Sequence, residues 1–99
     1  MSLNALQKEI SDLVADRFPL TNYTPFQRLA SLTVQIGDLS DTMLLKCGVK
    51  KNHKNQHLND KEALTAVLVD LLVLSEQLGV DLDKEMERAK HWFKFGVMP

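Results

Sequence analysis

The sequence predicts an all-α protein in which 99 residues form a four-helix bundle. Apolar residues recur at spacings of three and four, and residues that start or end helices recur between these segments. No segment alternates apolar and polar residues in the manner of a half-buried strand. We therefore expect one helical domain over residues 1–99, with helices at about 3–18, 25–47, 60–78 and 82–95.

The first two helices are predicted from spacing and from their end residues. Pro19 ends the first helix, because proline inside a helix removes a backbone hydrogen bond and clashes with the preceding turn. Thr24 can cap the second helix, Pro25 suits its first turn, and Gln27 completes a capping box. The first helix carries its apolar residues at helical spacing: Leu3, Leu6, Ile10, Leu13, Val14 and Phe18.

Gly37 lies inside the second helix, where glycine costs about 1 kcal/mol relative to alanine. This cost indicates that another element packs closely against that turn. Gly48 ends the helix, and a long polar connection follows it. Lys50, Lys51 and Lys54 in this connection either bind phosphate or belong to a solvated loop.

The third helix is expected to lie at the centre of an oligomer. Asn59 and Glu62 have the spacing of a helix cap, and the segment that follows is apolar almost all the way round. Such a helix must pack on several sides, and three short helices cannot readily cover it. We therefore expect a homo-oligomer, with a dimer as the default and a tetramer as the alternative. Gly79 ends this helix, and Asp81 can cap the last one.

Composition excludes several classes of protein. A formal net charge of −1 provides no field that would attract nucleic acid or an anionic membrane surface broadly. The apolar run at 63–74 is shorter than the roughly 20 residues that cross a bilayer. Cys47 is the only cysteine, which rules out an internal disulfide and fits a reducing, cytoplasmic setting. Cys47 itself is expected to be a small buried residue.

Asp70 is the one charge between Glu62 and Glu76, within a segment that should be buried. An isolated buried carboxylate is costly, so it requires a partner, water or a shifted pKa. Arg28 on the second helix is the first partner to expect. Arg28 also belongs to a polar stripe that either lines a groove or faces solvent: Arg28, Ser31, Gln35, Asp38 and Thr42, with Asp41 beside it.

Two motifs resemble the all-α nucleoside triphosphate pyrophosphohydrolases of the MazG and dCTPase type. The motifs are Gln35-Ile36-Gly37-Asp38-Leu39 and Leu78-Gly79-Val80-Asp81-Leu82, and the resemblance covers about residues 24–93. It implies a four-helix fold in which acidic residues on two facing helices hold Mg²⁺. Of the positions where it places these acids, only Asp38 is acidic; the others are Val34, Gln35, Ala63 and Ala66.

The resemblance leaves three functions open. The chain is a homologue whose Mg²⁺-dependent hydrolysis is lost or altered, or an inactive module that binds nucleotide or protein, or an active enzyme that releases pyrophosphate. For an active site, the metal ligands would be Asp38, Asp41, Asp70 and Glu62, with Gln35 as a neutral ligand. The residues that contact the nucleoside triphosphate would be Lys50, Lys51, Lys54 and Lys90.

Overall fold

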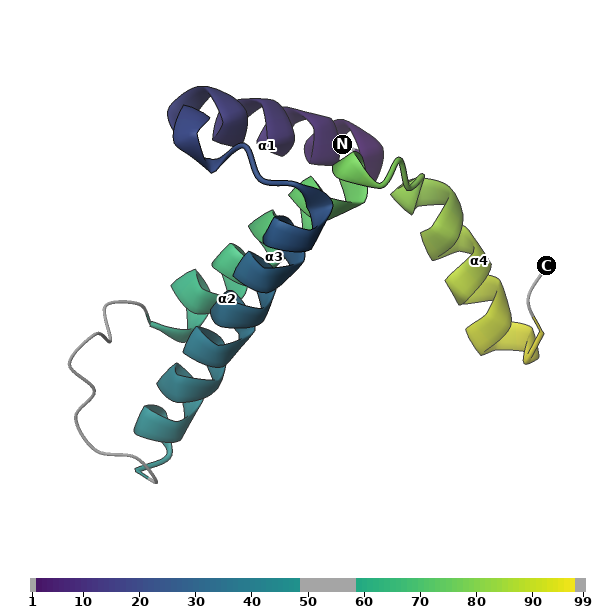
Figure 1. The fold of residues 1–99 in the computed structure, drawn as a ribbon. Coiled ribbons are helices and arrows are strands. Elements are labelled where there is room, and N and C mark those ends of the chain that lie inside the picture. Colours follow the sequence, from purple (N-terminus) through teal and green to yellow (C-terminus); the bar gives the residue numbers. More distant parts are fainter. Residues whose placement is uncertain (1, 49–58, 98–99) are drawn as a thin grey trace. The chain divides into compact units, whose positions relative to one another are not determined.

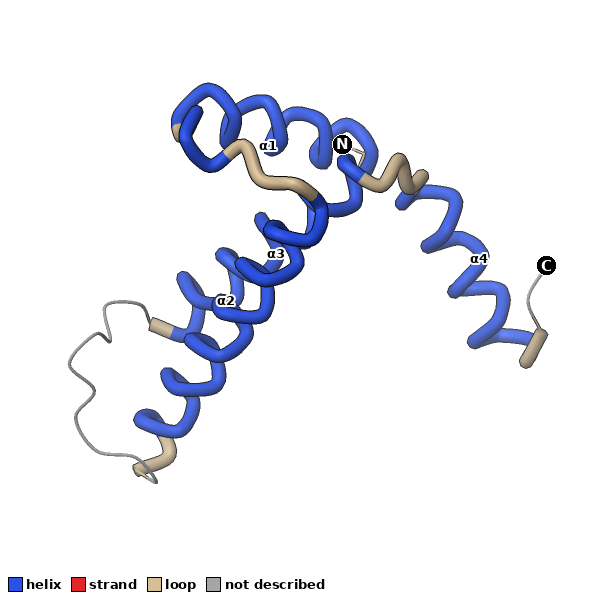
Figure 2. The backbone as a smooth tube through the Cα atoms, in the orientation of Figure 1, coloured by secondary structure: helices blue, strands red, loops and turns tan. Residues whose placement is uncertain are grey.

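The computed structural model describes residues 2–48 and 59–97 (Figure 1). In this part of the chain every regular element is a helix, as the tube in Figure 2 shows. The predicted all-α class and its four α-helices are confirmed, and each predicted boundary lies within one residue of the observed one. The elements are α1 (Leu3–Arg17), a 3₁₀ turn η1 (Pro19–Thr21), α2 (Pro25–Lys46), α3 (Asp60–Gln77) and α4 (Leu82–Phe95).

Backbone contacts group the chain into two compact units. One unit comprises Met1–Asn22 and Leu72–Pro99, and the other comprises Tyr23–Leu71. Helix α3 is continuous from one unit into the next. The expectation of one domain over residues 1–99 stays a prediction, and each unit is described by itself below.

The unit Tyr23–Leu71 contains α2 and the first part of α3, which run antiparallel (Figure 1). Ion pairs at both ends establish this direction, because Lys46 at the end of α2 meets Asp60, whereas Arg28 near its start meets Asp70. The small apolar core of this unit includes Leu32, which is 8% exposed, and Ala63, which is 0% exposed. The interior between the two helices is therefore partly apolar and partly ionic.

The predicted start of α2 is confirmed in detail. The side chain of Thr24 accepts a hydrogen bond from the backbone N–H of Gln27 at 3.2 Å. The Gln27 side chain in turn accepts from the backbone N–H of Thr24 at 2.9 Å. These reciprocal bonds satisfy amide groups that the first helical turn would otherwise leave without partners.

Gly37 departs from the expectation of close packing. A Cβ built on Gly37 would have no atom within 4 Å, once the two adjacent residues and the nearby backbone of its own helix are set aside. Leu64 and Leu68 of α3 are likewise 58% and 49% exposed. These leucines are exposed in the single chain, and the prediction that another subunit covers part of α3 stays a prediction.

The other unit contains α1, the last turns of α3 and α4. Leu72 and Val73 are buried, and Gln7 of α1 is only 4% exposed. The Gln7 amide donates to the Glu76 carboxylate at 2.9 Å and to the Val80 carbonyl at 3.2 Å. This side chain fastens α1 to the end of α3.

The lengths and compositions of the helices bear on membrane insertion. Within residues 2–48 and 59–97, no single helix is long and apolar enough to cross a bilayer. Helices α3 and α4 satisfy the same test when they are joined as one bent pair.

Candidate functional site

Asp70 lies between two donors on α2. Arg28 Nη1 donates to Asp70 Oδ1 at 3.0 Å, and Ser31 Oγ donates to Asp70 Oδ2 at 2.7 Å. Arg28 and Ser31 are three residues apart, so they share one face of α2 and reach the same side chain on α3. The expectation that Arg28 would be the partner of Asp70 is confirmed.

Burial makes this cluster energetically important. The side chains of Arg28 and Asp70 are only 7% and 8% exposed. The Arg28 guanidinium also lies 4.8 Å from the centroid of the Tyr23 ring, within the range of a cation–π interaction. Removing one member of a buried pair commonly costs about 3–5 kcal/mol, because the remaining charge is left without compensation.

A shallow depression of about 440 Å³ opens next to this cluster. Gln35 and Ala66 both border it, and these are two of the positions where the family resemblance places acidic ligands. A third such position, Ala63, is fully buried. The full lining is Gln35, Lys61, Glu62, Thr65, Ala66, Val69 and Asp70.

The four acidic residues predicted as metal ligands have different surroundings. Asp38 is exposed and Asp41 is half-buried. Glu62 and Asp70 border the same depression, which neither Asp38 nor Asp41 lines. In the described part of the chain, no group of three or more His, Cys, Asp or Glu side chains is placed to hold a metal ion. The proposed Mg²⁺ site stays a prediction.

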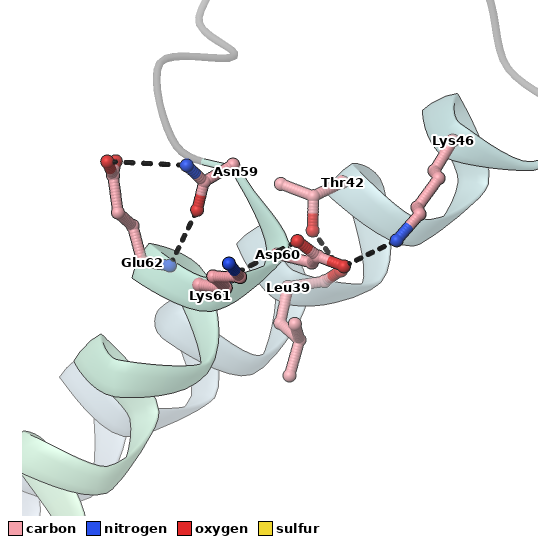
Figure 3. A network of polar contacts seen from close by, with 7 residues as sticks. All are labelled: Leu39, Thr42, Lys46, Asn59, Asp60, Lys61 and Glu62. Carbon is pink, nitrogen blue, oxygen red and sulfur yellow. Dashed lines mark hydrogen bonds and ion pairs between the residues drawn. The ribbon is translucent and has the colours of Figure 1, made fainter.

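Glu62 takes part in the predicted cap of α3 (Figure 3). Its backbone N–H donates to the side-chain oxygen of Asn59 at 2.9 Å, and the Asn59 amide donates to the Glu62 carboxylate at 3.5 Å. The predicted N-cap role of Asn59 is therefore confirmed, while the Glu62 carboxylate contacts the Asn59 side chain rather than its backbone N–H.

Lys46 and Asp60 join the end of α2 to the start of α3 at 2.8 Å (Figure 3). The hydrogen bond and charge of Lys46 hold the pKa of Asp60 below its ordinary value, and Asp60 raises the pKa of Lys46. Both side chains are substantially exposed, so this pair contributes little to stability.

A second depression, of about 490 Å³, lies at this end of the helix pair. Apolar atoms dominate its lining. Cys47 borders it and is exposed, so the expectation that Cys47 is a buried residue is wrong. The full lining is Leu39, Met43, Lys46, Cys47, Asp60, Lys61 and Leu64.

Of the four predicted phosphate-binding lysines, Lys90 is the one that lies among the described residues. Lys50, Lys51 and Lys54 lie outside the described residues. Lys90 lies on α4 and pairs with Glu87 at 2.6 Å, with the two side chains 62% and 72% exposed. Its contact is a solvated pair along one helix face.

One polar network was missed by reasoning from the sequence. Asp83 of α4 accepts from the backbone N–H of Leu3 at 2.9 Å and from that of Asn4 at 3.2 Å. The Asn4 side chain returns the interaction by accepting from the N–H of Asp83 and donating to Asp81 at 2.7 Å. The first turns of α1 and α4 therefore cap each other. Asp81 was expected to cap α4, but the proximity of Asn4 and Asp83 is a tertiary fact.

Asp81 is the second acid in this network. The hydrogen bond from Asn4, followed by the bond from the Lys84 backbone N–H, holds the pKa of Asp81 below its ordinary value. The carboxylate form is thus favoured by donors from two helices of the same unit.

Comparison with known protein families, with curated proteins and with solved structures finds no match to this chain.

Proposed function

We propose that this chain is a helical protein-interaction module that shares ancestry with the MazG-type pyrophosphohydrolases and has lost their Mg²⁺-dependent hydrolysis. Its expected state is a homo-oligomer in the cytoplasm, with a dimer as the default and a tetramer as the alternative. The α2–α3 pair serves as a scaffold whose interior ion pair fixes the relative position of its two helices.

The observation that carries this proposal is the engagement of Asp70. Arg28 and Ser31 each bond to one of its two carboxylate oxygens. If Asp70 bound a cation instead, both of these bonds would break. The Arg28 side chain, which is only 7% exposed, would then lose its contact with the Asp70 carboxylate. Mg²⁺ requires near-octahedral oxygen coordination, usually with one or two carboxylates. Asp38, the acid that the resemblance retains, does not border the depression beside Asp70.

A second candidate function is nucleotide binding, with or without pyrophosphate release. The depression of about 440 Å³ favours it, because Gln35 and Ala66 border that depression and the resemblance places its catalytic groove there. Lys61 supplies a positive charge at its rim, and Glu62 and Asp70 supply carboxylates. A phosphate-supported Mg²⁺ ion held by Asp38, Asp41, Asp70 or Glu62 belongs to this second candidate.

Calorimetric titration with Mg²⁺ and a panel of nucleoside triphosphates, followed by a pyrophosphate-release assay, separates the two functions. The interaction module predicts neither binding nor release. Binding without release would favour a nucleotide sensor. Release that disappears in Asp38→Ala but persists in Asp12→Ala would overturn the first proposal; Asp12 is a matched control because it is an exposed acid on α1.

A further inference from the structure

Helix α2 carries an uncharged seam along the side that α3 leaves uncovered. Its positions alternate in spacing between three and four, which is the heptad repeat of helices that pack side by side in coiled coils and bundles. All seven positions are exposed in the described structure, and none is charged. We call this set the outer seam: Phe26, Leu29, Thr33, Ile36, Ser40, Met43 and Cys47.

The outer seam and the exposed leucines of α3 lie on the same side of the α2–α3 pair. On α2, Leu29 and Met43 each follow by one residue a position that faces α3, namely Arg28 and Thr42. Leu64 likewise follows the buried Ala63 by one residue. Each step of one residue turns the side-chain direction by about 100° around the helix. In two antiparallel helices that face each other, the same turn away from the contact brings both side chains to the same side of the pair.

The apolar depression provides independent evidence for this placement. Met43 of α2 and Leu64 of α3 both line it. The opposite side of the pair carries the depression bordered by Glu62, Thr65 and Val69. The outer seam of α2 and the exposed leucines of α3 therefore lie on the side of the apolar depression, whose rim also carries Lys46, Asp60 and Lys61.

We infer that the outer seam binds the outer seam of a second copy of this chain, antiparallel, with Ile36 of one copy against Ile36 of the other. The central part of the seam points to this occupant, since from Leu29 to Met43 its residues are similar in both directions from Ile36. Leu29 and Met43 lie seven residues to either side of Ile36 and are both large and apolar. Thr33 and Ser40 lie three and four residues to either side and are both small hydroxyl residues.

In a two-fold interface residue i of one copy contacts residue j of the other and residue j contacts residue i, so residues at similar distances from the axis must fit each other. In the inferred dimer Leu29 meets the partner's Met43, and Thr33 meets the partner's Ser40. The Thr33 hydroxyl already donates to the Leu29 carbonyl at 3.0 Å, so the interface need not supply it with an acceptor.

The exposed area agrees with what a dimer needs. Phe26, Leu29, Ile36 and Met43 are 86%, 49%, 50% and 55% exposed, and Leu64 and Leu68 add to the same side. Together these six side chains offer on the order of 600 Å² per chain, compared with about 800 Å² per partner in a standard interface. Backbone and small side chains between them supply the rest.

Gly37 acquires a role in this arrangement. It neighbours Ile36, and the space around it is open in the single chain. Small residues at helix contacts allow backbones to approach closely, and Ala30, Thr33 and Ser40 are also small and exposed. The helix-weakening glycine is then explained by a neighbour that another copy provides.

Cysteine cross-linking tests the register directly. In a Cys47→Ser background, Ile36→Cys is expected to form an intermolecular disulfide in most molecules under mild oxidation. Val34→Cys is the matched control: Val34 is more exposed than Ile36, 62% against 50%, yet points about 200° away around α2. It should stay largely unlinked. Wild-type Cys47 should also stay unlinked, because the two copies of Cys47 would lie about 30 Å apart in the antiparallel dimer.

Charge substitution provides a second readout that does not depend on oxidation. Ile36→Glu and Ile36→Lys are each expected to weaken the dimer at least about 30-fold, because like charges would meet at the two-fold axis. An equimolar mixture of the two variants should regain the dimer by pairing Glu with Lys. Val34→Glu should leave the dimer unchanged, and circular dichroism verifies that every variant is helical.

A wild-type chain that sediments as a monomer at 100 µM (on the order of the upper range for weak dimers) would overturn the inference. A dimer in which Val34→Cys cross-links and Ile36→Cys does not would also overturn it, as would a seam that binds only a different helix. The inference rests on the interaction role proposed above. Its failure is distinguishable from a failure of that proposal, which is decided by pyrophosphate release rather than by self-association.

Discussion

Asp70 and Arg28 form an ion pair of 3.0 Å in the interior of the α2–α3 pair, with both side chains less than one-tenth exposed. This pair explains why an acidic residue occurs in the middle of an otherwise apolar helical segment. Ser31 bonds to the second carboxylate oxygen, so Asp70 has a donor at each oxygen. The geometry is that of a structural contact between two helices.

Replacing Ser31 by alanine should lower the free energy of unfolding by about 1.5 kcal/mol or more, because a hydrogen bond to a buried carboxylate is lost. Val34→Ala is the control, since Val34 lies on the same helix, is exposed and does not belong to the outer seam. Urea denaturation of both variants checks the difference. Equal stability of the two variants would show that the Ser31 bond to Asp70 contributes nothing.

Replacing Asp83 by alanine should cost about 2 kcal/mol, because the first two amides of α1 lose their acceptor. Glu87→Ala on the same helix should change stability by less than about 0.5 kcal/mol, since Glu87 belongs to an exposed pair. Thermal or urea unfolding of each variant measures these values. A Glu87→Ala variant as destabilised as Asp83→Ala would contradict the mutual capping of α1 and α4.

Stability should fall in acid partly through Asp81. Its folded pKa lies below its ordinary value of 3.8, so the unfolded chain takes up the proton first. The stabilisation that Asp81 contributes is therefore complete above pH 3.8, and it is lost as the pH falls through the lower pKa of the folded state. Asn4→Ala removes the largest cause of the shift and should flatten this dependence. Unfolding measured from pH 6 to pH 2 checks this (about the range over which carboxylates titrate); an unchanged slope in Asn4→Ala would contradict it.

Local signals in the sequence were sufficient for the helices. Thr24 with Gln27, and Asn59 with Glu62, act within a single turn, so their spacing alone predicts the observed caps. The pairing of Arg28 with Asp70 was also accessible, because one buried charge on α3 required a partner and α2 offered one on its facing side. These predictions depend on short distances along the chain or on simple charge balance.

Other features depend on how segments far apart in sequence meet. Asn4 and Asp83 are separated by most of the chain, and nothing local shows that their helices start side by side. Cys47 and Gly37 were misjudged for a related reason. The sequence shows that a residue is small or apolar, but whether another element covers it is decided by the arrangement of helices, including those of a second chain.

A double-mutant cycle on Arg28 and Asp70 tests the structural role of this pair most directly. Arg28→Leu and Asp70→Leu should each lower the free energy of unfolding by about 3 kcal/mol or more, because each leaves a buried charge without its partner. The double variant should be more stable than either single variant. If the single variants fail to fold while the double variant folds, the prediction is also met. Single substitutions that cost less than about 1 kcal/mol, with no coupling between them, would contradict the account and return Asp70 to the candidates for metal binding.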